Sequence, residues 1–66
     1  MYNLFFDGHQ KYGSMTLVAA RSIAGGMARK AIAGTRLTYT WELNNVCVVH
    51  DAIYTHHVIK IVEVKS

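Results

Sequence analysis

The sequence contains no proline and a single cysteine, Cys47, among its 66 residues. One cysteine excludes an intramolecular disulfide and predicts a reducing, cytoplasmic environment. Charged residues make up only 17% of the chain, yet no uncharged apolar run reaches the roughly 18 residues that a membrane span requires. The first residues, MYNLFFDGH, also lack the basic start and the small-residue cleavage site of a secretory signal. We therefore expect a cytoplasmic protein with no membrane partner.

Hydrophobic residues, by contrast, make up 52% of the chain, a share that argues against intrinsic disorder. The length predicts one domain, residues 1–66. A core of this size supplies about 3–5 kcal/mol at most, and chains this short commonly gain further stability from a disulfide, a metal ion or association. Because the disulfide is excluded, association or a metal would have to supply the difference.

The first half of the chain predicts a hairpin followed by a helix. YNLFF (2–6) and KYGSM (11–15) read as strands on either side of Asp7-Gly8, a strong turn signal. Thr16 is a suitable helix N-cap, and Gly34 is a suitable residue to follow the last helical turn. The apolar residues between them repeat on one helical face: Leu17, Ala20, Ile23, Ala24, Met27, Ala28 and Ala31.

The second half predicts three strands. RLTYTWEL (36–43) alternates strictly, Asn44-Asn45 forms a tight turn because asparagine tolerates positive φ, and VCVVH (46–50) is the return strand. We expect a loop over 51–57 and a last strand over 58–64. The fold class is α+β: a small single domain with one α-helix packed on a mostly antiparallel sheet of four to five strands, in the order β-β-α-β-β-β or β-α-β-β.

Three of the predicted strands are apolar on both faces. The opposed sets are Leu4 and Phe6 against Phe5, Cys47 and Val49 against Val46 and Val48, and Ile59 and Ile61 against Val58, Lys60, Val62 and Val64. Such strands are typical of sheets buried on both sides, whereas one helix covers only one side. Either the sheet curls into a partial barrel, or its edges and the 51–57 loop fold over the second face, or that face packs on another molecule. We expect the last, through self-association or a protein partner.

Two adjacent glycines, Gly25 and Gly26, interrupt the middle of the predicted helix. Each costs roughly 0.5–1 kcal/mol relative to alanine. Helical projection places Gly26 near the centre of the outward face. The other residues of that face are small or basic: Ala19, Ser22, Arg29, Lys30 and Ala33. Two explanations stay open: a flat surface that a partner approaches closely, and a tolerated kink.

The residue types that carry chemistry are poorly arranged for catalysis or for metal binding. AGGMARK lacks the glycine spacing of a phosphate-binding loop, and no dinucleotide-binding fingerprint is present. Cys47 and His50 have C-x-x-H spacing, but a strand points them to opposite faces, and the adjacent His56 and His57 diverge in the same way. We expect no metal, no cofactor and no enzyme activity.

Aromatic side chains and the flat helical face are the candidates for contact with a protein partner, because aromatic residues dominate interface energetics. The candidate set is Tyr39, Trp41, Tyr54, His57, Gly26, Arg29 and Lys30. Tyr39 and Trp41 share their strand face with Leu37 and Leu43, a pattern that favours a core role for both rings.

Nucleic-acid binding is the alternative function. Seven Lys and Arg residues against four Asp and Glu residues give a net charge of +3, which permits such binding without requiring it. Tyr39 and Trp41 stand two residues apart on one strand, where aromatic rings can stack on bases. The candidate phosphate contacts are Lys11, Arg29, Lys30 and Arg36. The chain has no RNP-type aromatic motif, KH-type GXXG loop or helix-turn-helix.

In size and in the order of its elements, the chain resembles very small phage-encoded proteins, among them anti-CRISPR proteins and inhibitors of host RNA polymerase. The resemblance involves no shared motif and carries over no functional residue. It implies an inhibitor or regulator that binds a host macromolecular machine and acts by steric occlusion. The sequence thus predicts a non-catalytic, self-associating protein-binding module, with a small basic nucleic-acid-binding protein as the alternative.

Overall fold

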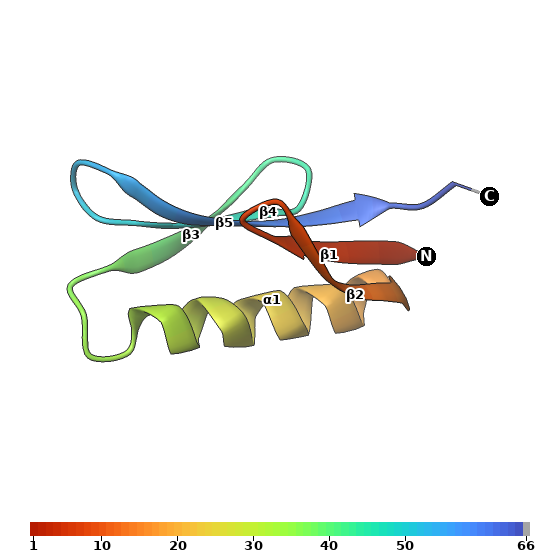
Figure 1. Ribbon diagram of the computed structural model, residues 1–66, viewed down its shortest axis with the longest axis horizontal. Coiled ribbons are helices and arrows are strands. Elements are labelled where there is room, and N and C mark those ends of the chain that lie inside the picture. The colour runs from red at the N-terminus through yellow and green to blue at the C-terminus, as the bar shows by residue number, and fades with distance from the viewer. Residues whose placement is uncertain (66) are drawn as a thin grey trace.

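The computed structural model describes residues 1–65 and confirms the α+β class, with one helix packed on a five-stranded antiparallel open sheet. The elements are β1 (Tyr2–Phe6), β2 (His9–Met15), α1 (Leu17–Ile32), β3 (Thr38–Glu42), β4 (Val46–His50) and β5 (Thr55–Glu63). Of the two predicted orders, β-β-α-β-β-β is the correct one. The strands lie in the order β2-β1-β5-β4-β3, so the last strand of the chain is central and β2 and β3 are the edges (Figure 1).

Two tight turns connect the strands of the β1–β2 and β3–β4 hairpins. Asp7 and Gly8 have φ of 50° and 85°, and Asn44 and Asn45 have φ of 62° and 58°, the positive values that two-residue hairpin turns favour. Both predicted turns are therefore confirmed. The first turn uses only two residues, so β2 begins at His9, two residues earlier than expected.

The predicted loop over 51–57 is wrong in its length. β5 begins at Thr55, so the connection between β4 and β5 spans only 51–54, and His56 and His57 belong to the strand. The backbone N–H of Asp51 donates to the carbonyl of Tyr54 at 3.0 Å, which closes the turn. The local composition gives weak strand propensity to this segment, and pairing of β5 with β4 and β1 overrides it.

The helix begins and ends where its capping residues predict. The Thr16 hydroxyl accepts a hydrogen bond from the Ala19 N–H at 3.2 Å, and Gly34 follows the last turn with φ of 73°. Ala20, Ala24 and Ala28 have no exposed surface. Because these side chains are small and recur every four residues, they allow close approach of the helix to the sheet.

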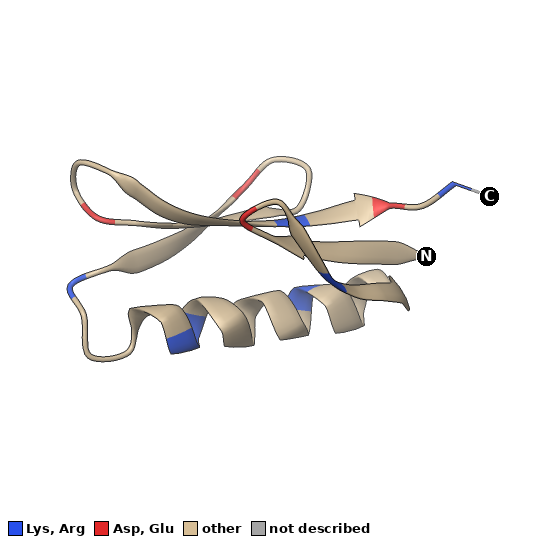
Figure 2. Cartoon of the chain, in the orientation of Figure 1, with Lys and Arg blue, Asp and Glu red and all other residues tan. Residues whose placement is uncertain are grey.

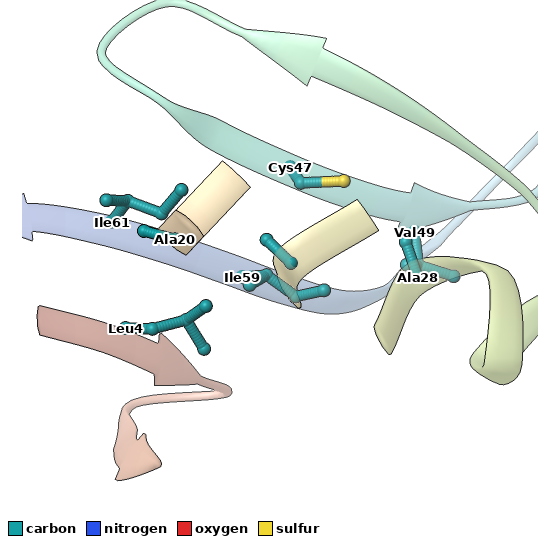
Figure 3. Close-up of a cluster of buried hydrophobic side chains, with 8 residues drawn as sticks. Leu4, Ala20, Ala28, Cys47, Val49, Ile59 and Ile61 are labelled. Carbon is teal, nitrogen blue, oxygen red and sulfur yellow. The ribbon is translucent and has the colours of Figure 1, made fainter. Parts of the chain in front are cut away.

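The core lies between α1 and one face of the sheet (Figure 3). Its fully or nearly fully buried members are Leu4, Ala20, Ala24, Ala28, Cys47, Val49, Ile59 and Ile61. Burial of each Val, Leu or Ile side chain contributes roughly 1.5–3 kcal/mol. Of the predicted apolar face of the helix, Ala20, Ala24 and Ala28 are fully buried, whereas Leu17, Ile23, Met27 and Ala31 are half-buried. Within residues 1–65, no element covers the opposite face of the sheet (Figure 1).

Candidate binding surface

The face of the sheet that points away from α1, here called the open face, is apolar at its centre. Phe5, Val46, Val48 and Val58 are only half-buried there, and Val62 is 44% exposed. Val48 lies opposite Val58 in the ladder between β4 and β5, while its chain neighbour Val49 is fully buried on the covered face. In the part of the chain that the structure describes, the sheet stays open and no second layer covers this face (Figure 1). The predicted closure into a partial barrel and the predicted cover by the sheet edges and the 51–57 loop are therefore wrong, and packing of this face on another molecule stays a prediction.

Two opposite charges stand in one cross-strand row of the open face. Val46 pairs with Glu42 on β3 and with Lys60 on β5, so the valine separates the carboxylate from the ammonium group. Lys60 also pairs with Phe5 on β1, so both of its cross-strand neighbours, Val46 and Phe5, are apolar. Neither charge has an ion-pair partner within residues 1–65. The apolar face therefore contains one separated pair of opposite charges.

Hydroxyl and imidazole groups cover the end of this face near the β4–β5 turn. Nδ1 of His50 donates to the Asp51 carbonyl at 2.9 Å, and Nε2 of the same ring lies 3.3 Å from the Thr40 hydroxyl. With Nδ1 donating, the neutral ring accepts from Thr40 through Nε2. Both ring nitrogens therefore have a hydrogen-bond partner within the protein.

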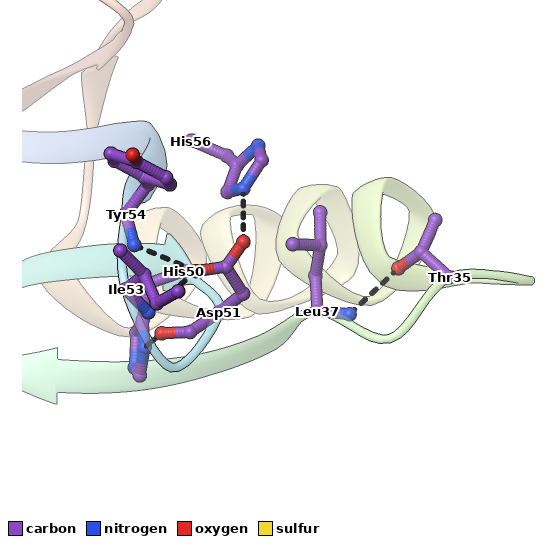
Figure 4. A network of polar contacts seen from close by, with 7 residues as sticks. All are labelled: Thr35, Leu37, His50, Asp51, Ile53, Tyr54 and His56. Carbon is purple, nitrogen blue, oxygen red and sulfur yellow. Dashed lines mark hydrogen bonds and ion pairs between the residues drawn. The ribbon is translucent and has the colours of Figure 1, made fainter.

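The β4–β5 turn is shaped by the carboxylate of Asp51 (Figure 4). Its Oδ1 accepts from the Ile53 and Tyr54 N–H groups at 2.7 and 2.6 Å, and its Oδ2 accepts from Nε2 of His56 at 2.8 Å. These bonds, with that of Tyr54 foremost, followed by those of His56 and Ile53, lower the pKa of Asp51 to about 2. Ile53 and Tyr54 are left 79% and 69% exposed, so the turn does not fold over the open face.

The two predicted aromatic anchors on β3 lie on the covered face instead. Tyr39 and Trp41 are half-buried and pack against the core cluster. The guanidinium carbon of Arg21 lies 4.1 Å from the centroid of the Trp41 ring, and Arg21 also donates to the Asn45 side chain at 2.8 Å. One face of the indole is therefore occupied by the chain's own cation, an arrangement that favours the core interpretation of both rings.

His57, a third predicted anchor, also points to the covered side. Its Nδ1 donates to Oδ2 of Asp7 at 2.7 Å, and its ring centroid lies 5.1 Å from that of Phe6. The hydrogen bond from His57 is the largest cause of the lowered pKa of Asp7. Of the four predicted aromatic and histidine anchors, Tyr54 alone is exposed, in the β4–β5 turn.

The glycine pair on the helix is covered by the chain itself. Gly25 is buried and Gly26 is half-buried. A Cβ at Gly25 would lie 3.2 Å from one guanidinium nitrogen of Arg29, and a Cβ at Gly26 would lie 3.9 Å from the other. The missing side chains make room for the Arg29 guanidinium to lie back along the helix.

The basic candidates lie on the helix side of the molecule. α1 carries Arg21, Arg29 and Lys30 with no acidic residue, whereas all four acidic residues belong to the sheet and its turns (Figure 2). Lys11 and Lys30 line one hollow of about 360 Å³ together with Phe6, Met27 and Ala31. Arg36 lies in the connection between α1 and β3 and is not part of this hollow.

The potential metal ligands diverge in space. Cys47 is buried on the covered face, where burial raises the pKa of its thiol, while His50 belongs to the open face. Within residues 1–65, no group of three or more His, Cys, Asp and Glu side chains is arranged to hold a metal ion. Nor does this part of the chain contain a helix long and apolar enough to cross a membrane.

Sequence reasoning missed the carboxylates of Asp7 and Asp51, which organise two turns, and the charge pair of Glu42 and Lys60. The turn carboxylates carry a recognisable signal, because Asp at the start of a short connection commonly accepts from N–H groups a few residues on. The charge pair carries none in the linear sequence, since it depends on the register of three strands.

Comparisons with protein-family models, with curated proteins and with solved structures found no match to this chain.

Proposed function

We propose that the protein is a non-catalytic binding module that recognises another protein through the open face of its sheet. The observation that carries the proposal is the contrast within β4: Val49 is fully buried beneath α1, whereas Val46 and Val48 are half-buried on an apolar face that no element of residues 1–65 covers. Apolar area removed from water contributes about 25 cal/mol per Å², so contact with a complementary surface on this face is favourable.

Binding through this face would act by occlusion. A rigid sheet that covers an apolar patch of a partner prevents other molecules from reaching that patch, without a chemical step by this chain. Such an inhibitor or regulator gains affinity mainly from apolar contact, so its binding should depend weakly on salt, in contrast to attachment through phosphate groups.

A photoreactive amino acid at position 48 tests the proposal. The matched control places it at Val18, which is 80% exposed on the helix side. We expect position 48 to cross-link to protein, either a second copy or a component of cell lysate, and Val18 to cross-link far less. Cross-linking that is absent at position 48, or equal at the two positions, would overturn the proposal.

Nucleic-acid binding is the second candidate, and the absence of acidic residues on α1 favours it. Its test is the double change of Arg29 and Lys30 to Glu. Retention of DNA or RNA that falls steeply with salt and disappears in this variant would support it. Unchanged or absent retention would remove the helix as a phosphate-binding surface.

A further inference from the structure

We propose that the partner of the open face is a second copy of this chain, packed face to face in a dimer whose two-fold axis runs along β4. This inference rests on the proposed function, because it fills the same surface. It goes further by fixing the occupant, the symmetry and the residue pairs in contact. Charge and shape each support it.

Glu42 and Lys60 are both exposed to water, and neither forms an ion pair within residues 1–65. Glu42, Val46 and Lys60 form one row across β3, β4 and β5. Neighbouring strands are about 4.8 Å apart, so the strand positions of Glu42 and Lys60 are separated by roughly 10 Å. Covering this face with an uncharged apolar surface would bury Lys60 without a counter-charge, which is strongly unfavourable.

A two-fold axis along β4 satisfies both charges. It exchanges β3 with β5 between the two copies, so Lys60 of each copy faces Glu42 of the other. Val46 and Val48 then face the same residues of the second copy across the axis. An axis along β5 would bring the two Lys60 side chains together, and an axis across the strands would leave each Lys60 without a carboxylate. Among face-to-face arrangements, the charges therefore select β4.

The shape of the sheet suits the same axis. In Figure 1 the β3–β4 turn and the β4–β5 turn both rise on the side away from α1, at opposite ends of the strands, while the start of β3 descends toward the helix. A twisted sheet raises two diagonal corners and lowers the other two. Rotation about an axis along β4 places the raised corners of one copy over the lowered corners of the other, in the aligned packing that sandwiched sheets adopt.

This packing also covers Val62, which lies at the end of β5 and is 44% exposed. The axis brings the β3–β4 turn of each copy over the end of β5 of the other. With the axis along β4, the contact joins β3, β4 and β5 of the two copies, while β1 and β2 of each copy extend beyond it.

Single charge reversals at Glu42 and at Lys60, made in separate variants, test the dimer. In Lys60→Glu each copy presents two acidic groups, and in Glu42→Lys each copy presents two basic groups. Sedimentation equilibrium across a dilution series should give twice the 7.4 kDa chain mass for the unmodified protein, with a dissociation constant raised at least about tenfold in either variant. Mixing the two variants should restore the dimer, because both contacts then join opposite charges. Lys11→Glu and Glu63→Lys, which lie outside this row, are matched controls that should keep the unmodified mass.

Restoration on mixing, with unchanged controls, would establish the arrangement. A dimer that both variants leave intact, or a mixture that stays monomeric while each variant keeps its circular dichroism spectrum, would overturn it. A monomer at every concentration would also overturn it. In that case, cross-linking from position 48 to a different protein would leave the proposed function standing, and no cross-linking at all would overturn both.

Discussion

Asp7 and His57 are fifty residues apart in the chain, and Nδ1 of His57 donates to Oδ2 of Asp7 at 2.7 Å. The other carboxylate oxygen accepts from the N–H of Val58 at 2.8 Å. Asp7 also occupies the first position of the β1–β2 turn, with φ of 50°. The Asp7 carboxylate therefore attaches the β1–β2 turn to the central strand β5.

Asp7→Ala should lower the free energy of unfolding by about 1–2 kcal/mol, because it removes two hydrogen bonds and places alanine at positive φ. Asp7→Asn is the control, since asparagine tolerates this φ and still accepts from Val58. Urea unfolding followed by Trp41 fluorescence measures both. Equal stability of Asp7→Ala and the unmodified protein would contradict the assigned role.

Acid should remove the same stabilisation in a defined direction. Because the hydrogen bond from His57, and secondarily that from Val58, lower the pKa of Asp7 below its ordinary 3.8, the contribution is present above that value and is lost as the pH falls through the lowered pKa. The difference in stability between the unmodified protein and Asp7→Ala should therefore shrink below pH 4. A stability difference that grows as the pH falls would contradict this prediction.

The β4–β5 turn should stay closed at pH values where a carboxylate of ordinary pKa is already protonated. The pKa of Asp51 is held at about 2, so its bonds to the Ile53 and Tyr54 N–H groups should persist at pH 3 and weaken near pH 2. Amide chemical shifts of Ile53 and Tyr54 report the change. Asp51→Asn serves as the comparison, and its two amide shifts should not show this titration.

Replacement of the helical glycines should stabilise the fold. A Cβ at Gly26 meets only ordinary contact with Arg29, so Gly26→Ala should raise the free energy of unfolding by about 0.5–1 kcal/mol. At Gly25 the Cβ lies 3.2 Å from the flexible end of Arg29, which must move, so Gly25→Ala should gain less. Thermal unfolding measures the stability of both variants. Destabilisation by Gly26→Ala would show that position 26 requires glycine for a reason other than its contact with Arg29.

The Cys47 thiol should react only when the protein unfolds. Burial beneath α1 raises its pKa, against a smaller opposing effect of Arg21, and the side chain has no exposed surface. Labelling by a chromogenic disulfide reagent at pH 8 should be slow in the native protein and fast in denaturant. Rapid labelling under native conditions would contradict the packing of β4 against the helix.

Local residue chemistry determined the parts of this fold that could be predicted. Asp7-Gly8, Asn44-Asn45, Thr16 and Gly34 each carry their conformational preference in their own side chain or its absence, and all four features are found where expected. The start of β5 was misplaced because His56 and His57 have no strong strand preference, and pairing with both β4 and β1 decides their conformation.

The binding surface was predictable only in part, for a related reason. Alternation along a strand showed that both faces are apolar, and it assigned Val48 and Val49 to opposite sides, as the structure has them. Alternation does not give the order of the strands in the sheet, so the row that joins Glu42, Val46 and Lys60 could not be predicted from the sequence. The stacking of Arg21 on Trp41 also depends on how the helix crosses the sheet.

Solvent access at Val48 in the unmodified protein tests the account most directly. A soluble paramagnetic agent broadens the methyl signals of exposed side chains, and Val18, 80% exposed on the helix side, provides the internal reference. At millimolar protein concentration the Val48 methyl groups should be broadened much less than in Lys60→Glu, while Val18 is broadened equally in both. Equal broadening of Val48 in the two proteins would contradict a second copy on the open face.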